Sequence, residues 1–456
     1  MTAVREAATR LVCAGCGSSP GNDEPYPFRC PHLGEGDVDH VLRRVIDPTV
    51  VTFPAGPPIG GEPLVTYRDL LHSYHRAISG GASDGEFVSL VERLDAAVAA
   101  VDGHGFAPTP FGRSEHLSKA LGFNDGGGVW VKDETGNVAG SHKARHLMGV
   151  LLHLEVAELL GLASPGDRPD LAIASCGNAA LAAAVVAAAG GRRLRVFVPV
   201  DADTGIVARL EQLGAEVNVC PRQPGTAGDP AYARLREAIA AGALAFTCQG
   251  NENGLAIEGG ETLGYEIVSD LSATGTALDH IVVQVGGGAL ASSCMQAFSE
   301  AVELGAAARA PRAHTVQTFG AHPLERAYHR VKALLAEGPA GTVSRAGIDR
   351  AMSTAASHRS EYMWPWESEP KSIAHGILDD ETYDWLAVVG GMLTSGGQPL
   401  VVSEQRLGEA NELAKAAGYA VDPTGSSGLA GLVDLLAGGV VRPGERVALL
   451  FTGAER

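Results

Sequence analysis

Short apolar stretches rich in valine and isoleucine alternate with longer helical segments along most of this chain. Most of them are nearly continuous apolar runs, which is typical of strands buried on both faces of a sheet. Glycine or proline marks the ends of the intervening helices. The pattern therefore predicts an α/β fold with parallel sheets covered by helices on both faces. The predicted strands are residues 171–175, 194–200, 216–220, 280–286, 314–320, 399–403 and 446–453.

The length and charge of the chain limit the functions that it can serve. A chain of 456 residues suggests two or three domains, and 45% hydrophobic residues with 59 glycines can bury a large core. The net charge of −18 repels nucleic acid and anionic membrane surfaces, so local backbone donors must hold any anionic ligand. The N-terminus has no apolar targeting segment, and the alanine-rich run 179–190 is too short to span a bilayer. We expect a cytoplasmic protein that binds neither nucleic acid nor membrane.

Seven cysteines are too few and too scattered for a disulfide framework in a chain of this size. Four of them stand alone in apolar surroundings and are predicted to be buried small hydrophobic residues. These are Cys176, Cys220, Cys248 and Cys294.

The other three cysteines lie near the N-terminus. Cys13 and Cys16 form a C-x-x-C pair, and Cys30 and His32 follow a proline-rich turn. Two such knuckles brought together supply four ligands, so these residues form a candidate zinc site. The second knuckle lacks the usual C-x-x-C spacing, and a relic of a ribbon with free thiols is the alternative. Residues 34–62, rich in glycine, proline and acidic residues, are predicted to be a linker that wraps the surface.

A lysine at the start of a helical run is the first candidate for chemistry. An amphipathic helix is predicted at 87–101 and a strand at 129–132, and the chain then reaches Lys143 after a Gly-Ser turn. The positive end of a helix dipole disfavours the ammonium form of a lysine, and a free amine can form a Schiff base. For one lysine taken alone, a solvated surface position is the ordinary alternative.

Three further motifs follow predicted strands, at the edge where open α/β sheets bind ligands. Asn178 ends the sequence ASCGN, and its amide could lie against a flat ring and donate a hydrogen bond to a hydroxyl on that ring; an ordinary helix N-cap is the alternative. Residues 286–290 combine three glycines with a helix start, which suits a single phosphate; a plain tight turn is the alternative. Thr452 lies at the end of the last predicted strand, where its hydroxyl either meets a heteroaromatic nitrogen or caps a helix.

In this order, the lysine, the asparagine, the glycine loop and the late threonine resemble the fold type II pyridoxal-phosphate enzymes, the tryptophan synthase β superfamily. The resemblance covers residues 105–456 and is strongest to threonine synthase and threonine dehydratase. It implies two parallel-sheet, three-layer domains with the cofactor in the cleft between them, and a homodimer. The phrases that carry it are VKDET at 131–135, GSHKAR at 140–145, SCGN at 175–178, EGGET at 258–262, GYE at 264–266 and LFTG at 450–453.

The resemblance also implies a role for each candidate residue. Lys143 would form the Schiff base with pyridoxal phosphate, Asn178 would hydrogen-bond its ring oxygen, and Thr452 would face its pyridine nitrogen. A neutral threonine does not keep that nitrogen protonated, so the ring would be a weaker electron sink and elimination the easier outcome. Whether a monovalent cation also binds stays open. The cofactor phosphate would bind at Gly286, Gly287, Gly288, Ala289 and Leu290, and the amino-acid substrate at Ser141, Ser175 and Gly177.

Residues 1–62 are predicted to form a cysteine-containing N-terminal segment and linker. By the same resemblance, residues 63–456 form the catalytic region, made of two interleaved α/β subdomains. The implied activity is that of a threonine-synthase-like lyase, which eliminates or replaces a group at the β, or β and γ, carbons of an amino acid. The implied intermediate is of the aminoacrylate or aminocrotonate type.

Departures from the threonine synthase pattern keep other activities open. His142 precedes the lysine, as in tryptophan synthase β, and either contacts the cofactor or packs. The aspartate that usually follows the lysine is absent, and these changes lie where a phosphorylated side chain would be handled. An ammonia-lyase acting on serine, threonine or diaminopropionate, or a β-replacement synthase, is the alternative. A second phosphate pocket near Ser141, Arg145 and Ser175 would separate the two.

Two further points stay open at the level of sequence. A catalytically silent relative that binds a metabolite is the alternative outside the enzymes, although it would have no need of the amine of Lys143. The insert 358–377 carries aromatic residues beside charges, and it either lines the entrance of the site or packs as a surface loop.

Overall fold

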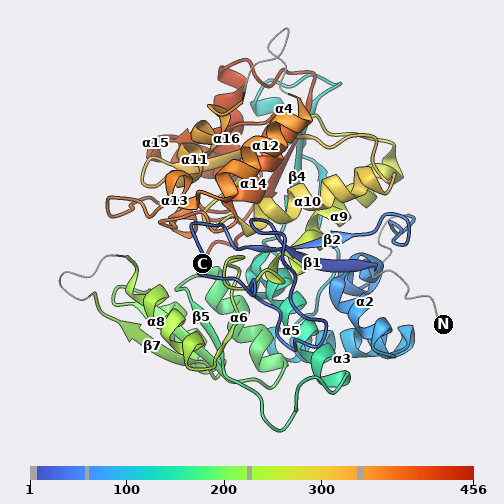
Figure 1. Ribbon diagram of the computed structural model, residues 1–456. Coiled ribbons are helices and arrows are strands. Elements are labelled where there is room, and N and C mark those ends of the chain that lie inside the picture. Colours follow the sequence, from blue (N-terminus) through green and yellow to red (C-terminus); the bar gives the residue numbers. More distant parts are fainter. Residues whose placement is uncertain (1–7, 57–60, 223–227, 336–343) are drawn as a thin grey trace.

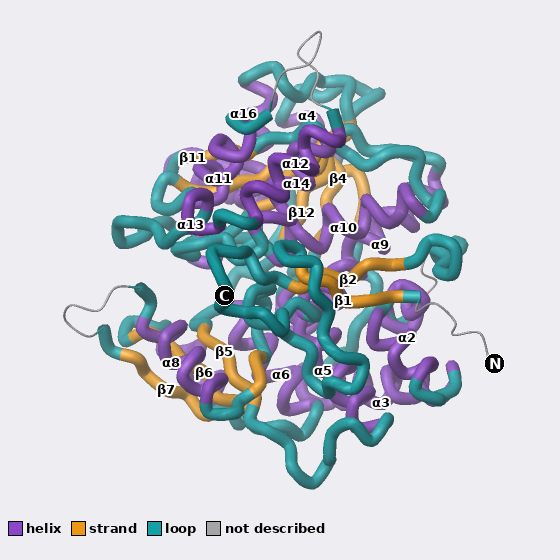
Figure 2. Tube along the Cα trace, in the orientation of Figure 1, coloured by secondary structure: helices purple, strands orange, loops and turns teal. Residues whose placement is uncertain are grey.

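Two sheets of mainly parallel strands organise residues 8–56, 61–222, 228–335 and 344–456, the part of the chain that the computed structural model describes (Figures 1 and 2). The larger sheet has six strands in the order β11-β10-β9-β12-β4-β3, and only β3 runs antiparallel to its neighbour. Its strands are β3 (Phe111–Arg113), β4 (Gly128–Asp133), β9 (His280–Gln284), β10 (Arg312–Thr318), β11 (Pro399–Val402) and β12 (Arg446–Phe451).

The smaller sheet has four parallel strands in the order β7-β6-β5-β8. The chain contributes two strands to the larger sheet, builds the smaller sheet, and then returns to complete the larger one. The predicted strands are confirmed in both sheets, whereas the short β3 and β8 were not predicted. The strands of the smaller sheet are β5 (Leu171–Ala174), β6 (Leu194–Pro199), β7 (Glu216–Cys220) and β8 (Leu244–Ala245).

Helices cover both faces of the larger sheet, because successive strand residues point to opposite sides. On β9, Ile281 and Val283 pack into one core with α10 and α14, whereas Val282 packs into another with α15 and α16. The elements around this sheet are α4 (Glu115–Ala120), α9 (Ala256–Thr274), α10 (Ala289–Glu303), α11 (Pro323–Lys332), α12 (Arg345–Ala356), α13 (Arg359–Tyr362), η4 (His375–Ile377), α14 (Trp385–Ser395), α15 (Glu404–Ala416) and α16 (Ser427–Ala437).

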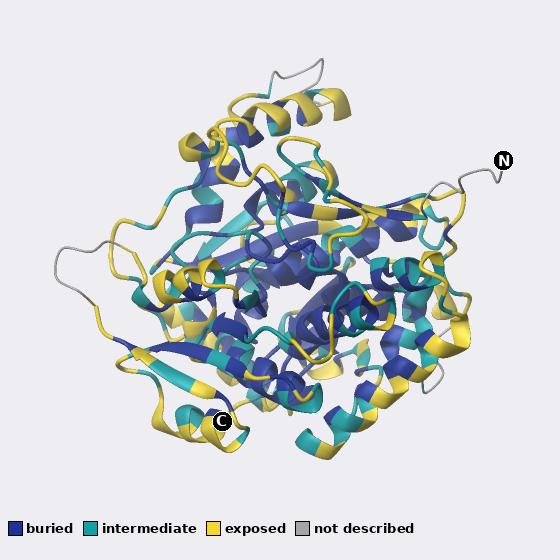
Figure 3. Cartoon of the chain, turned by 60° about the horizontal axis from the view of Figure 1, so that its bottom comes forward, coloured by how far each residue is buried: buried dark blue, intermediate teal, exposed yellow. Residues whose placement is uncertain are grey.

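The smaller sheet is covered in the same way. Ile173 and Val196 pack into the core that holds α5 and α6, whereas Phe197 packs on the other face against Leu235 of α8. Figure 3 shows the buried residues gathered in the interior and the exposed ones on outer helix turns. The elements on this side are α1 (Pro63–Thr66), η1 (Arg68–Leu70), α2 (His72–Ser79), α3 (Asp84–Asp102), η2 (Val138–Gly140), α5 (Lys143–Leu159), α6 (Asn178–Ala189), α7 (Thr204–Gln212) and α8 (Pro230–Ala240).

A close glycine contact joins the two halves of the molecule. Gly259 of α9 lies so near α5 that a Cβ atom there would overlap the carbonyl oxygen of Arg145, and Gly149 of α5 meets the Gly259 backbone in the same way. The ring of His146 lies over Gly260, and its Nδ1 donates to the Ala256 carbonyl oxygen over 2.7 Å. The helix that begins at Lys143 is therefore held at backbone contact by α9.

The N-terminal segment is more ordered than a linker. Its strands β1 (Thr9–Cys13) and β2 (Leu42–Ile46) pair antiparallel, so the predicted wrapping linker at 34–62 is wrong over 42–46. The hairpin is coloured blue in Figure 1 and is joined to α9 and α10, because the buried guanidinium of Arg44 on β2 contacts Glu261 and Tyr265 of α9 and Glu300 of α10. Within the described residues, no helix has the length and apolar character needed to cross a membrane.

Candidate functional site

The start of α5 is joined to the end of β12. Ser141 forms an isolated antiparallel bridge with Gly453, and the backbone N–H of His142 donates to the Thr452 carbonyl oxygen over 3.4 Å. The Nδ1 atom of His142 lies 3.2 Å from the same oxygen. Lys143 is the next residue and the first of α5, and it is half-buried. The carboxyl end of the last strand thus holds the lysine that the sequence singled out.

Gln284 positions the hydroxyl of Thr452. Its Nε2 donates to Thr452 Oγ1 over 2.5 Å and lies 3.0 Å from the carbonyl oxygens of Gly425 and Leu450. Because the threonine oxygen accepts this hydrogen bond, its own hydrogen is free to donate to another acceptor. Gln284 was not among the predicted site residues. The signal available was its place at the end of β9, directly before the glycine loop.

Buried polar atoms without partners occur in the two residues before the lysine and at Gln284. The Oγ atom of Ser141, Nε2 of His142 and Oε1 of Gln284 have no hydrogen-bond partner among the described residues. A carbonyl oxygen only accepts, so Nδ1 of His142 carries the proton and Nε2 keeps its lone pair. Burial, followed by the nearby Lys143, lowers the pKa of His142 well below its usual value, so the ring is neutral. Unpartnered polar atoms of this kind are costly unless a ligand satisfies them.

The predicted phosphate loop connects β9 to α10. Gly288 has φ +99°, a left-handed conformation that favours glycine. Residues 379–384 cover the loop closely: Thr382 Oγ1 donates to the Gly286 carbonyl oxygen over 2.9 Å, and the Asp384 N–H donates to that of Gly287 over 3.0 Å. Ala289 and Leu290 begin α10, and both have buried apolar side chains. Only their backbone groups could therefore contact a ligand in the loop.

A carboxyl group faces this loop. A Cβ atom at Gly286 would overlap the Asp379 carboxyl. Burial raises the pKa of this carboxyl to about 6, although the nearby Lys143 acts to lower it. Burial and then Asp39 raise the pKa of Asp384 to about 7. A protonated carboxyl donates a hydrogen bond to an anion, whereas an ionised one repels it. With a pKa of about 6, Asp379 is still mainly ionised at neutral pH, so a phosphate in the loop would require this carboxyl to take up a proton or to move.

The structure also brings Asn178 to the end of β12. Asn178 is the first residue of α6, and its amide lies so close to Gly453 that a Cβ atom there would overlap it. Its Oδ1 accepts a hydrogen bond from the guanidinium of Arg456. Ser175 and Gly177 lie at the same helix start, where the Gly177 N–H donates to Ser175 Oγ over 3.4 Å. In the described residues, no hydrogen bond joins either of them to Lys143.

The predictions for the cysteines were partly wrong. Cys220, Cys248 and Cys294 are buried as predicted, but Cys176 is exposed because it lies in the turn before α6. At the N-terminus, His32 points away from the thiols, and its Nδ1 lies 3.0 Å from Glu35 Oε2. The ring that joins Cys13, Cys16 and Cys30 belongs to His40.

Arg145 does not line an open pocket. The residue is 2% exposed, and its Nε donates to Glu134 over 2.8 Å while Nη1 donates to Glu266 over 2.6 Å. Lys132 also contacts Glu266, so two cations and two anions neutralise one another in the interior. Arg145 is therefore occupied by the protein itself.

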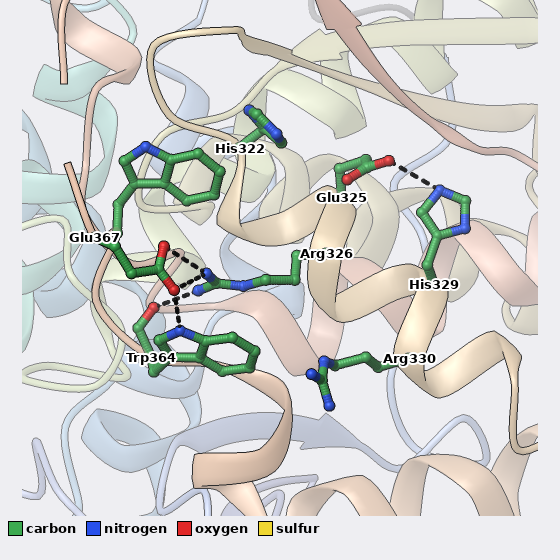
Figure 4. A pocket seen from close by; sticks show the side chains of 8 residues that line it. His322, Glu325, Arg326, His329, Arg330, Trp364 and Glu367 are labelled. Carbon is green, nitrogen blue, oxygen red and sulfur yellow. Dashed lines mark hydrogen bonds and ion pairs between the residues drawn. The ribbon is translucent and has the colours of Figure 1, made fainter.

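The aromatic insert packs against α11. Arg326 of α11 lies 3.6 Å from the ring centre of Trp364, and it donates to Glu367 over 2.9 Å (Figure 4). These residues line a hollow of about 500 Å³ with His322 and Arg330. The end of the insert reaches the glycine loop, because a Cβ atom at Gly286 would overlap the Cα atom of Ile377, and residues 379–384 continue this contact. Whether the insert also lines the entrance remains a prediction.

Comparison with known proteins identifies a family for most of the chain after the N-terminal segment. Residues 104–453 match the family model described as pyridoxal-phosphate dependent enzyme. The chain is 25% identical over 347 residues to the threonine synthase of Methanocaldococcus jannaschii, covering 76% of this chain and 74% of that protein.

Two solved structures share the fold. One is the processed form of threonine deaminase isoform 2 from Solanum lycopersicum, with a TM-score of 0.55, 16% identity, and coverage of 82% of this chain and 91% of that one. The other is diaminopropionate ammonia lyase from Escherichia coli, with a TM-score of 0.56, 14% identity, and coverage of 81% and 88%. One of these proteins is a deaminase and the other is an ammonia lyase, so the same fold is found in enzymes with different substrates.

Proposed function

The chain belongs to the pyridoxal-phosphate dependent enzymes, and from this premise we propose that it is a lyase acting on an unphosphorylated amino acid. The reaction would be elimination of a group from the β carbon, as in the ammonia-lyases. The observation that carries the proposal is the environment of Arg145, the cation that follows Lys143 by two residues in the GSHKAR motif. Its guanidinium is buried against Glu134 and Glu266, so it offers no second phosphate pocket.

The residues present fit the cofactor. Lys143 would hold its aldehyde carbon, the N–H groups of residues 286–290 would hold its phosphate, and Asn178 would meet its ring oxygen. The unpartnered Ser141 Oγ and His142 Nε2 are buried polar atoms that a ligand at Lys143 would satisfy. When bound, pyridoxal phosphate withdraws electrons from the α carbon of an amino acid, so that a group on the β carbon can leave.

The protein itself supplies proton transfer and orientation. The amine of Lys143, released when the substrate amine takes its place on the aldehyde carbon, would remove the proton of the substrate α carbon. His142 is neutral, and its Nε2 lone pair can accept a hydrogen bond beside the lysine. Thr452, oriented by Gln284, would donate its hydroxyl hydrogen to a ring nitrogen rather than protonate it. This neutral partner favours elimination over reactions that need a stronger electron sink.

A threonine-synthase-type reaction on a phosphorylated substrate is the second candidate. The threonine synthase of M. jannaschii, which matches over 347 residues, favours it. It would require a phosphate site built from residues other than Arg145. Both candidates share the first steps at the α carbon, so the identity of the leaving group distinguishes them.

A product assay separates the candidates. The purified chain, supplied with pyridoxal phosphate, is incubated with serine, threonine, O-phosphoserine or O-phosphohomoserine, while 2-oxo acid, ammonia and phosphate are measured. We expect 2-oxo acid and ammonia from serine or threonine, loss of this activity in Lys143→Ala, and normal activity in Lys119→Ala, an exposed lysine of α4. Threonine and phosphate from O-phosphohomoserine alone would establish the second candidate instead. No turnover of any substrate by cofactor-loaded protein would favour a silent relative.

A further inference from the structure

A compact group of three thiols and one imidazole lies at one end of the N-terminal hairpin, on the last residue of β1 and on the chain that connects β1 to β2. The ligand atoms of Cys13, Cys16, Cys30 and His40 all lie within 4.8 Å of one another. The Sγ atoms of Cys16 and Cys30 are 3.5 Å apart, and Sγ of Cys13 is 3.7 Å from Nδ1 of His40. A tetrahedral zinc ion with metal–sulfur bonds near 2.3 Å requires ligand atoms about 3.8 Å apart, so the four are spaced for one metal ion.

The imidazole of His40 is already in the form that binds a metal. Its Nε2 lies 2.9 Å from the Glu35 carbonyl oxygen, which only accepts, so Nε2 carries the proton. Nδ1 therefore keeps its lone pair, and it is the atom that faces the thiols. A backbone carbonyl that fixes the tautomer in this way is the usual outer partner of a metal-ligating histidine.

Backbone donors also face the sulfur atoms. The N–H of Cys16 lies 3.5 Å from Sγ of Cys13, and the N–H of His32 lies 3.4 Å from Sγ of Cys30. Hydrogen bonds of this kind stabilise the negative charge of a thiolate, the form that binds a metal. His32 thus contributes its backbone N–H to the group, whereas its ring is directed to Glu35.

We propose that Cys13, Cys16, Cys30 and His40 bind one zinc ion, which fixes the N-terminal segment to residues 356–385. Three thiolates and one neutral imidazole are a ligand set that selects zinc, and the three thiols release their protons as the metal binds. The four residues lie outside 104–453, the part that matches the family, so the site does not depend on the proposed reaction.

The residues next to His40 provide the link. The N–H of Asp39 donates to the Ala356 carbonyl oxygen over 2.8 Å, and its carboxylate accepts from Trp385 Nε1 over 3.1 Å and from Arg359 Nε over 3.2 Å. Trp385 follows Asp384, whose N–H donates to the carbonyl oxygen of Gly287. The metal would therefore hold the segment that covers the glycine loop, through contacts that are separate from Lys143.

Metal analysis of two matched histidine variants tests the site. The full chain, purified without chelator and supplied with zinc, is analysed by mass spectrometry of its metal content, and we expect about one zinc per chain. His40→Ala should weaken zinc binding by roughly a hundredfold or more, because removing a ligand costs at least as much as removing an outer partner. His32→Ala should keep the metal. A zinc-free chain with a Cys16–Cys30 disulfide, or equal loss in both variants, would overturn the proposal.

Cobalt substitution keeps the test decisive if His40→Ala does not fold. The unaltered chain loaded with Co²⁺ should show the visible bands of a tetrahedral site and sulfur-to-cobalt charge transfer, and their absence would overturn the site. Hydrogen exchange then tests the link. We expect metal removal to speed exchange of residues 356–385 while β5 and β6 stay unchanged, and unchanged exchange in 356–385 would overturn the proposed fixing of that segment.

Discussion

Arg145 lies two residues after Lys143, yet its role in the structure is different. Its guanidinium is buried between Glu134 and Glu266, and Lys132 shares the second of these carboxylates. Breaking a buried ion pair from one side leaves an uncompensated charge in the interior, which is more destabilising than the loss of a surface charge.

Replacement of Arg145 tests this structural role. We expect Arg145→Met to lower the free energy of unfolding by about 3–5 kcal/mol in urea denaturation. The matched control Arg93→Met removes an exposed arginine of α3 and should change it by less than about 0.5 kcal/mol. If Arg145→Met is as stable as the unaltered chain but loses affinity for a phosphorylated amino acid, Arg145 is a substrate ligand after all.

The sequence was sufficient to predict some contacts of single residues and not others. Thr452 and the loop after Gln284 follow neighbouring parallel strands, whose carboxyl ends meet at one edge, so their proximity could be expected. His40 could not be found in this way. Its spacing from Cys30 matches no ligand pattern, and it reaches Cys13 only because β1 pairs with β2 in the register that sets Cys13 opposite Leu42.

At the scale of elements, the contact of α5 with α9 decides where Lys143 lies. Gly259 allows the two helix backbones to meet, since any side chain there would overlap the Arg145 carbonyl oxygen. Gly408 in α15 provides a contrast, because a Cβ atom there meets nothing within 4 Å.

The same substitution at these two glycines should therefore have opposite effects. Gly259→Ala is expected to lower the free energy of unfolding by about 1–3 kcal/mol, because the helices must move apart. Gly408→Ala is expected to raise it by about 0.5–1 kcal/mol, because alanine favours a helix over glycine. Urea denaturation of both variants measures the difference. A stabilising Gly259→Ala would show that α5 and α9 are not in backbone contact.

The elements that sequence reasoning missed have a common cause. β3 and β8 span three and two residues, too short for an apolar pattern to develop, and they exist because a neighbouring strand offers an edge. β2 contains two arginines, which interrupt the apolar pattern expected of a buried strand. Arg44 is buried there only because the fold brings Glu261 and Glu300 to its guanidinium. Tertiary contacts, rather than local pattern, form these elements.

At the scale of the whole molecule, the two sheets and the N-terminal hairpin converge on the start of α5. The ends of β9 and β12 supply Gln284 and Thr452, the turn after β5 supplies Asn178, and the hairpin reaches the cover of the glycine loop through Asp39. The net charge of −18 makes the general field unfavourable for a phosphate. Anion binding in this molecule therefore depends on local backbone donors at helix starts.

Covalent trapping at Lys143 tests the central claim most directly. The unaltered chain and Lys143→Ala are incubated with pyridoxal phosphate and reduced with borohydride, which makes any link between a lysine amine and the cofactor permanent. Peptide mass spectrometry then locates the added group. The account predicts one labelled peptide, containing Lys143, and no label in Lys143→Ala. Label at another lysine, or equal labelling of both proteins, would contradict it.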